Sequence, residues 1–317
     1  MTRHLNSIPS LSGLVDVEAE IKPPTYHRQR LLLYLLEEAG GSLSKIDLQK
    51  LLLLYIKESE VKHYSFVPYL YGCYSFLAAD DLDLLEKREW LTIKGNQIKI
   101  AKSLENQVWA QESVERQKLR NWIVKRPARG SALIREVYHK YPYYAIRSKI
   151  KDRSLNPDVL LCINKEIDSF KYSQSTMFTI GYEGIHFEDY INKLICNGVT
   201  LLCDVRKNPH SRKFGFSQLT LSTILPKMGI AYKHIPQLGI ESEKRRNLKS
   251  LKDYENLFLD YSKSLPKNKT YLNRVMNLLR KHNRIALTCF EKESQNCHRH
   301  CVTDLLQKNY DLTVIHL

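Results

Sequence analysis

Val199-Thr-Leu-Leu-Cys-Asp-Val-Arg206 is the stretch of sequence that decides the fold of the C-terminal part of this chain. It is mostly apolar up to Asp204, as expected for a strand buried on both faces of a parallel sheet. A helix is predicted before it, over residues 187–197, with Gly198 as its cap. A polar loop begins at Arg206. This order of helix, buried strand and polar loop predicts one unit of an α/β sheet.

The same alternation extends outward in both directions. Further strands are predicted at residues 177–180, 230–235, 284–289 and 312–317. Helices are predicted at residues 217–228, within 253–282, and from about residue 297 to 308. Strands that alternate with helices predict a Rossmann-like, mostly parallel α/β domain over residues 176–317.

Polar residues follow four of these strands, where such sheets bind ligands. We expect Asp204, Glu291, Cys297 and His298 to be catalytic. The residues expected to bind an anion or substrate are Gly181, Tyr182, Glu183, Arg206, Ser211, Arg212 and Arg299. Arginine presents a planar fork of donors to phosphate or carboxylate. The sequence therefore predicts an anion-binding site at this rim, and we expect it to be an active site.

Two of the candidate catalytic residues have a second interpretation. Asp204 can activate water, or it can be an ion-pair partner of Arg206 or Arg212. Cys297 opens a predicted helix, where the helix end, His298 and Arg299 would lower the pKa of its thiol. It can equally be a small buried hydrophobic residue.

Cys289, Cys297, His298 and Cys301 offer the side-chain types of a zinc site. The spacing matches no zinc ribbon or finger. Neither a dinucleotide fingerprint nor a P-loop is present. We therefore predict no metal and no cofactor.

The N-terminal part divides into an arm over residues 1–24 and a small domain over residues 25–102. Helices are predicted at residues 27–39, 44–59 and 77–89, with Ser44 capping the second. Lys94-Gly-Asn-Gln97 lies between two short apolar runs and predicts a hairpin. Three helices and a hairpin predict a winged helix. The aromatic residues between 64 and 76 are expected to pack in its core.

Residues 103–175 predict a basic helical connector, in which Ser131 is expected to cap a helix. Its tyrosines lie among cations and could stack bases while the cations hold phosphates, or they could pack inward. The residues predicted to bind nucleic acid are Arg126, Arg129, Arg147, Lys149 and Lys151.

Charge and cysteine content restrict the partners and the compartment. Residues 1–110 hold 13 Lys+Arg against 14 Asp+Glu, residues 111–175 hold 14 against 7, and residues 176–317 hold 22 against 13. This basic excess favours nucleic acid, DNA more than RNA, or a nucleotide as partner. There are seven cysteines, an odd number, and neither a signal peptide nor a membrane span is recognisable. We expect a cytoplasmic protein without structural disulfides.

Two resemblances add to these predictions. Thr179-Ile-Gly-Tyr-Glu-Gly, Asp204-Val-Arg-Lys-Asn-Pro-His-Ser-Arg, Leu287-Thr-Cys-Phe-Glu and Cys297-His-Arg resemble the domain-of-unknown-function 488 family across residues 176–317. The resemblance implies a Rossmann-like fold. It places the family's polar set on Gly181, Asp204, Arg206, Ser211, Arg212, Glu291, Cys297, His298 and Arg299. Tyr182-Glu183 departs from the His-Ser of many members, and Gly239-Ile240 departs from two glycines.

Leu48-Gln-Lys-Leu-Leu and Phe66-Val-Pro-Tyr-Leu-Tyr-Gly-Cys-Tyr-Ser resemble the Panacea (SocA-like) antitoxin winged-helix family. A winged helix suggests DNA reading, but a net charge near zero argues against strong phosphate contact. A protein partner or dimerisation is therefore at least as well supported for residues 25–102.

The leading hypothesis is an enzyme of hydrolase or glycosylase type that acts on nucleic acid or a nucleotide, in genome maintenance or phage defence. The first alternative is a regulatory module that binds nucleic acid without catalysis. The second is rhodanese-like thiol chemistry at Cys297 or Cys289, by analogy of fold.

Overall fold

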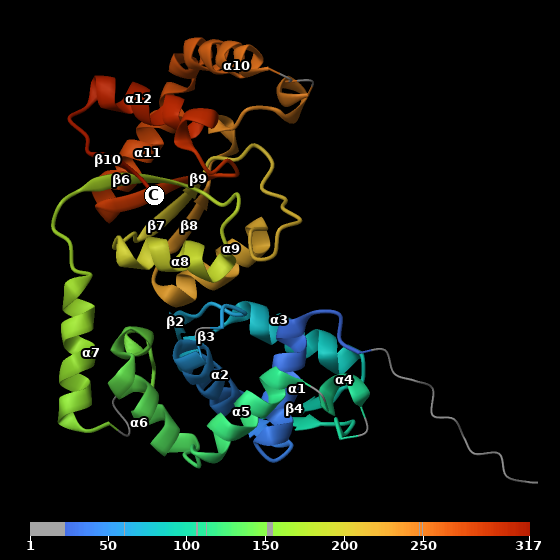
Figure 1. The fold of residues 1–317 in the computed structure, drawn as a ribbon. Coiled ribbons are helices and arrows are strands. Elements are labelled where there is room, and N and C mark those ends of the chain that lie inside the picture. Colours follow the sequence, from blue (N-terminus) through green and yellow to red (C-terminus); the bar gives the residue numbers. More distant parts are fainter. Residues whose placement is uncertain are drawn as a thin grey trace, which may run out of the picture.

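The computed structural model describes residues 23–317 except 60, 106, 112, 151–154, 247 and 249. It has an N-terminal part that is mainly helical and a C-terminal α/β domain. Figure 1 shows the C-terminal domain above the N-terminal part. Most of the predicted arm, residues 1–22, lies outside the described residues, and so does Lys151. Among the described residues, no helix combines the length and the apolar character that crossing a bilayer requires.

The first part of the chain has the predicted winged-helix order. Its elements are α1 (His27–Glu38), β1 (Ser42–Ser44), α2 (Lys45–Ser59), β2 (Val67–Tyr69), β3 (Gly72–Tyr74), α3 (Phe76–Lys87), β4 (Leu91–Lys94) and β5 (Gln97–Ile100). The antiparallel sheet has the order β1-β5-β4. Ser44 accepts a hydrogen bond from the backbone N–H of Asp47, so it caps α2 as predicted. The aromatic segment also contains the β2–β3 hairpin, which was not predicted.

The connector is helical, as predicted. It contains α4 (Val108–Gln111), α5 (Val114–Val124), α6 (Gly130–Lys140), the 3₁₀ turn η1 (Pro142–Ala145) and α7 (Pro157–Ser169). α6 begins at Gly130, one residue before Ser131, so the prediction that Ser131 is its cap was wrong. The connector helices share one core with α1 to α3. The connector is therefore packed onto the winged-helix part.

The C-terminal domain contains β6 (Thr176–Gly181), α8 (Phe187–Cys196), β7 (Leu201–Asp204), α9 (Gln218–Ile224), β8 (Ala231–His234), α10 (Leu251–Ser264), α11 (Lys269–His282), β9 (Arg284–Cys289), α12 (Arg299–Asn309) and β10 (Val314–His316). Five short 3₁₀ turns complete it: η3 (Leu225–Met228), η4 (Pro236–Leu238), η5 (Ser242–Arg245), η6 (Leu265–Asn268) and η7 (Ser294–Asn296). The sheet order is β10-β6-β9-β7-β8 and every pairing is parallel. This confirms the predicted Rossmann-like class.

Side chains alternate between two buried faces of this sheet. In β9, Ile285 and Leu287 belong to the core under α10, α11 and α12, whereas Ala286 belongs to the core under α8 and α9. Burial on both faces explains why these strands read as continuous apolar runs. The helices after β6 and β7 cover one face, and those after β8 and β9 cover the other, as Figure 1 shows. The chain therefore leaves β9 toward one face of the sheet and leaves its neighbours β6 and β7 toward the other face. This divergence creates the switch-point crevice in which open α/β sheets bind ligands.

The two parts of the chain meet at the start of α8. Glu188 is buried and its carboxylate accepts hydrogen bonds from the backbone N–H of Leu77, at 2.9 Å, and from Ser75. The rings of Phe76 and Phe187 pack edge to face, 5.5 Å apart. Burial raises the pKa of Glu188, although these donors act in the opposite direction.

Candidate functional site

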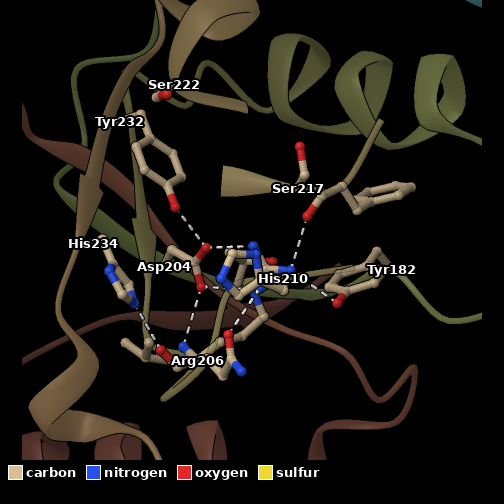
Figure 2. A network of polar contacts seen from close by, with 12 residues as sticks. Tyr182, Asp204, Arg206, His210, Ser217, Ser222, Tyr232 and His234 are labelled. Carbon is tan, nitrogen blue, oxygen red and sulfur yellow. Dashed lines mark hydrogen bonds and ion pairs between the residues drawn. The ribbon is translucent and has the colours of Figure 1, made fainter. Parts of the chain in front are cut away.

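Asp204 and Arg206 form a buried ion pair at the carboxyl end of β7, shown in Figure 2. The Nε and Nη2 of Arg206 donate to the two carboxylate oxygens of Asp204, and the Tyr232 hydroxyl donates to one of them at 2.7 Å. The Nη1 of Arg206 donates to the Tyr182 hydroxyl and to the Phe216 carbonyl, at 2.8 and 2.9 Å. Burial alone would lower the pKa of Arg206, but Asp204 raises it.

This network confirms the ion-pair interpretation of Asp204. Its side chain is 0% exposed, so it does not reach a water-filled space. Arg206 holds Asp204, Tyr182 and the chain at Phe216, where the sequence analysis expected it to hold an anion. The Tyr182 ring stacks on Phe216 with centroids 4.4 Å apart, which fixes the start of the loop after β6.

Arg299 also binds the protein itself. It is 1% exposed, and its guanidinium donates to the carbonyls of Glu291 and Lys292. Gly181 shapes the same loop, because a Cβ there would lie 1.8 Å from the Glu291 carbonyl oxygen. Glu183 accepts from the N–H of Lys292 at 3.0 Å. These three residues hold the loop after β9 in place, a structural role that differs from the expected anion contacts.

A cluster of thiols and an imidazole lies where β9 ends. The Sγ atoms of Cys289 and Cys297 lie 3.7 and 3.8 Å from His298 Nδ1. All three side chains are at most 2% exposed. His298 Nε2 lies 3.1 Å from the carbonyl oxygen of Val205, at the end of β7. The end of the sheet thus brings together two of the four predicted catalytic residues with Cys289.

Glu291 and Arg245 complete this cluster. Glu291 Oε2 lies 3.2 Å from Cys289 Sγ, and Arg245 Nη1 donates to Glu291 Oε1 at 2.6 Å. Arg245 Nη2 donates to His298 Nδ1 at 2.8 Å. Burial and the neighbouring Cys289 raise the pKa of Glu291, against the opposing charge of Arg245.

The two thiols differ in their pKa shifts. A hydrogen bond from Cys297, together with His298 and Arg245, lowers the pKa of the Cys289 thiol. Burial raises the pKa of the Cys297 thiol. α12 begins at Arg299, two residues beyond Cys297. The backbone of Cys297 is extended, so its thiol is not part of the first turn of the helix. The prediction that the helix start lowers the pKa of Cys297 was therefore wrong.

Above this cluster is a basic cleft of about 380 Å³. The lining side chains that have positive or titratable nitrogen groups are Arg206, Lys207, His210, Arg212, Arg245 and His298. Lys207 and Arg212 are exposed, and Lys207 lies 3.4 Å from Glu241. Ser211 also lines the cleft, and its hydroxyl accepts from the N–H of Lys213. Of the predicted anion-binding arginines, Arg212 is the one with an exposed side chain.

Sequence reasoning missed Arg245. It lies in the run Glu243-Lys-Arg-Arg, which looks like a solvated charged segment. Its partners Glu291 and His298 are 46 and 53 residues away in the chain. The signal available in the sequence was the position of this run after β8, at the same rim as the other strand ends.

The predicted nucleic-acid-binding residues of the connector that the structure describes do not line this cleft, and the side chains of Arg126 and Arg129 bind other groups of the chain. Arg126 pairs with Glu58 and stacks on the Trp122 ring. Arg129 donates to the carbonyls of Arg126 and Ala128. Burial lowers the pKa of Arg147, and Lys149 is exposed.

The connector tyrosines pack inward, as the alternative interpretation predicted. Tyr138 is 0% exposed and its hydroxyl bonds to Ser148, while the Tyr143 hydroxyl donates to Asn192. Stacking on bases would require these rings to be free.

Comparison with known proteins identifies the C-terminal domain. The model of the family described as Domain of unknown function DUF488 matches residues 186–306. This match spans α8 to most of α12, including Asp204, Glu291, Cys297 and His298. No curated protein and no solved structure matches the chain. The C-terminal domain of this chain therefore belongs to the Domain of unknown function DUF488 family.

Proposed function

We propose that the C-terminal domain is a hydrolase that acts on a phosphate-bearing substrate of the nucleotide class in the cleft above β9. The observation that carries this proposal is the position of Glu291. Its carboxylate lies at the wall of a basic cleft, at the switch point of a parallel sheet, within reach of a thiol and a guanidinium. Ligands of open α/β sheets bind at this position.

The size and charge of the cleft fit such a substrate. A volume of about 380 Å³ lies within the range of sites for small ligands, roughly 300–1,000 Å³. Lys207 and Arg212 are exposed at its rim, where they can pair with phosphate oxygens. The excess of positive charge in residues 176–317 attracts such an anion from a distance. A nucleotide unit could be free or could be the end of a strand.

Glu291 is the proposed general base. Because burial and the neighbouring Cys289 raise its pKa, Glu291 is a better proton acceptor than an ordinary carboxylate. It would take one proton from a water molecule, and the resulting hydroxide would attack the electrophilic centre of the substrate. The same carboxyl group would then return the proton to the leaving group.

Binding and turnover can be tested separately. Nucleoside mono-, di- and triphosphates and short oligonucleotides would be titrated against the full chain at several salt concentrations. We expect Glu291→Gln to abolish turnover and to keep binding, because the amide retains the shape of the carboxylate. Lys207→Gln with Arg212→Gln should weaken binding and flatten its salt dependence.

Three outcomes would contradict the proposal. Binding that is the same in the Lys207/Arg212 double variant would exclude the cleft as the anion site. Turnover that survives Glu291→Gln would exclude Glu291 as the base, and binding without turnover in any variant would favour a regulatory module.

Thiol chemistry is a second candidate function, and the geometry favours Cys289 over Cys297 for it. Cys289 lines the cleft and lies 3.2 Å from a carboxylate oxygen. Thiol chemistry predicts that, once the exposed Cys162 and Cys196 are replaced by serine, iodoacetamide modifies Cys289 before the other cysteines. Nucleotide in the cleft should slow this reaction. Equal labelling with and without nucleotide would argue against it.

A further inference from the structure

We propose that Cys289, Cys297 and His298 form a binding site for a zinc-class metal ion with one open coordination position. Their ligand atoms, two sulfurs and one imidazole nitrogen, all lie within 4.8 Å of one another. A tetrahedral ion with bonds of about 2.3 Å to sulfur and about 2.0 Å to nitrogen holds these atoms roughly 3.6 Å apart. The observed separations from His298 Nδ1, 3.7 and 3.8 Å, are close to this value.

The imidazole is already oriented for metal binding. Only one acceptor, the carbonyl of Val205, lies 3.1 Å from Nε2 among the contacts of the described residues, so the proton belongs on Nε2. The lone pair is then on Nδ1, which lies 3.7 and 3.8 Å from the two sulfurs and accepts from Arg245 Nη2. Histidines that bind metals usually donate their second ring N–H to a backbone carbonyl or a carboxylate in this way. Val205 is itself fixed, because its N–H donates to Thr288.

The site has three protein ligands. Cys301, which the sequence analysis considered as a fourth ligand, has its Sγ 3.3 Å from the ring of His300 and 4.0 Å from the Phe258 carbonyl. Structural zinc sites have four protein ligands, whereas three ligands and an open position are typical of catalytic sites. Cys289 and His298 line the basic cleft, so the open position is available to water or substrate from that side.

Arg245 supplies the positive charge in the absence of a metal. Its guanidinium lies against both His298 Nδ1 and Glu291. Its buried Nε has no hydrogen-bond partner among the residues that the structure describes, and 30% of its side chain is exposed. It sits on the short turn η5, so it can leave the imidazole when a metal binds. Arg245 and a metal ion would therefore compete for His298 Nδ1.

This inference rests on the proposed function and deepens it. A bound zinc-class ion lowers the pKa of a coordinated water molecule to about 7. Glu291, whose Oε2 lies 3.2 Å from one ligand sulfur, is placed to accept the proton from such a water. The cluster would then contribute the water activation and the cleft would contribute substrate binding.

Cobalt(II) titration of the metal-free full chain tests the site. We expect equimolar binding with thiolate-to-cobalt charge-transfer absorption and the visible bands of tetrahedral cobalt, both removed by zinc. Cys289→Ser and Cys297→Ser should each weaken binding by more than the roughly 10–100-fold that changes in outer-shell residues cost. Cys301→Ser is the matched control and should keep the bands. Arg245→Gln should tighten metal binding.

The absence of these bands in folded wild-type protein would overturn the inference. So would their loss in Cys301→Ser, or an intramolecular disulfide between Cys289 and Cys297 with no metal uptake. Circular dichroism shows whether each variant is folded, and His298→Asn gives a ligand change that leaves both thiols in place. Nucleotide turnover by the metal-free protein would refute the part of the metal in water activation and leave the proposed function standing. Metal binding without nucleotide binding would refute the proposed function alone.

Discussion

Replacing Asp204 by alanine should strongly destabilise the C-terminal domain. The change leaves the guanidinium of Arg206, in a side chain only 5% exposed, without its charged partner, and it removes the acceptor of the Tyr232 hydroxyl. Breaking a buried ion pair by removing one partner costs about 3–5 kcal/mol. At roughly 2–4 °C per kcal/mol for a domain of this size class, Tm should fall by on the order of 10 °C.

The positions of the tryptophans make this effect measurable by domain. All three, Trp90, Trp109 and Trp122, lie in the N-terminal part. Tryptophan fluorescence therefore follows that part, whereas far-UV circular dichroism follows both. We expect the thermal transition of Asp204→Ala to split in circular dichroism into two steps. The step at lower temperature should be weaker in tryptophan fluorescence than in circular dichroism.

A double variant provides the control. Asp204→Leu with Arg206→Met removes both charges, and it should recover much of the lost stability because apolar replacements of similar volume often match a buried pair. The reasoning is refuted if Asp204→Ala unfolds within about 1 kcal/mol of the wild type while Asp204→Asn abolishes turnover. Asp204 would then be a catalytic group and not a structural one.

Three further predictions concern other parts of the chain. Gly181→Ala should cost about 1–3 kcal/mol in unfolding free energy through overpacking, because the new Cβ would collide with the carbonyl of Glu291. The variant should also weaken cobalt binding. An unchanged denaturation midpoint would contradict the close approach of Gly181 to Glu291. Glu188→Gln should be neutral or stabilising at pH 7, because the raised pKa of Glu188 means that its stabilising contribution is present at low pH and is lost as pH rises through that pKa. Any gain in unfolding free energy of this variant, measured by urea denaturation, should shrink in acid. A difference that is constant with pH would argue against the raised pKa. Arg126→Ala should leave nucleotide and oligonucleotide binding unchanged because its guanidinium is paired with Glu58, and a large loss of affinity would return the connector to consideration as a nucleic-acid site.

The order of strands and helices was predictable because it depends on local pattern. The run that became β9 was predicted with the bounds that the structure has, since both of its faces are buried and the apolar run is uninterrupted. β1 and the pair β2–β3 were missed, because three-residue strands have too few positions to show alternation. The start of α12 was misplaced by two residues, because Cys297 and His298 are shaped by contacts with β7 and β9 rather than by helix propensity.

The site was predictable in location and only partly in content. Strand ends of a parallel sheet converge, so Glu291 and His298 could be placed at one rim from sequence alone. The partners of Arg206 and Arg299 could not be predicted from the sequence. A charged side chain at a strand end can face solvent or turn inward, and the packing of distant segments determines which of the two occurs. Arg245 reaches the cluster through a loop whose path the local sequence does not determine.

The contact between Glu188 and the start of α3 has a consequence for the whole chain. The first N–H groups of a helix are where anions bind most readily, and at α3 a carboxylate from the other half of the molecule already accepts from Leu77. A phosphate could take that place only by displacing Glu188. Thermodynamic reciprocity then requires that phosphate binding at this helix end and loss of the Glu188 contact favour each other by the same free energy.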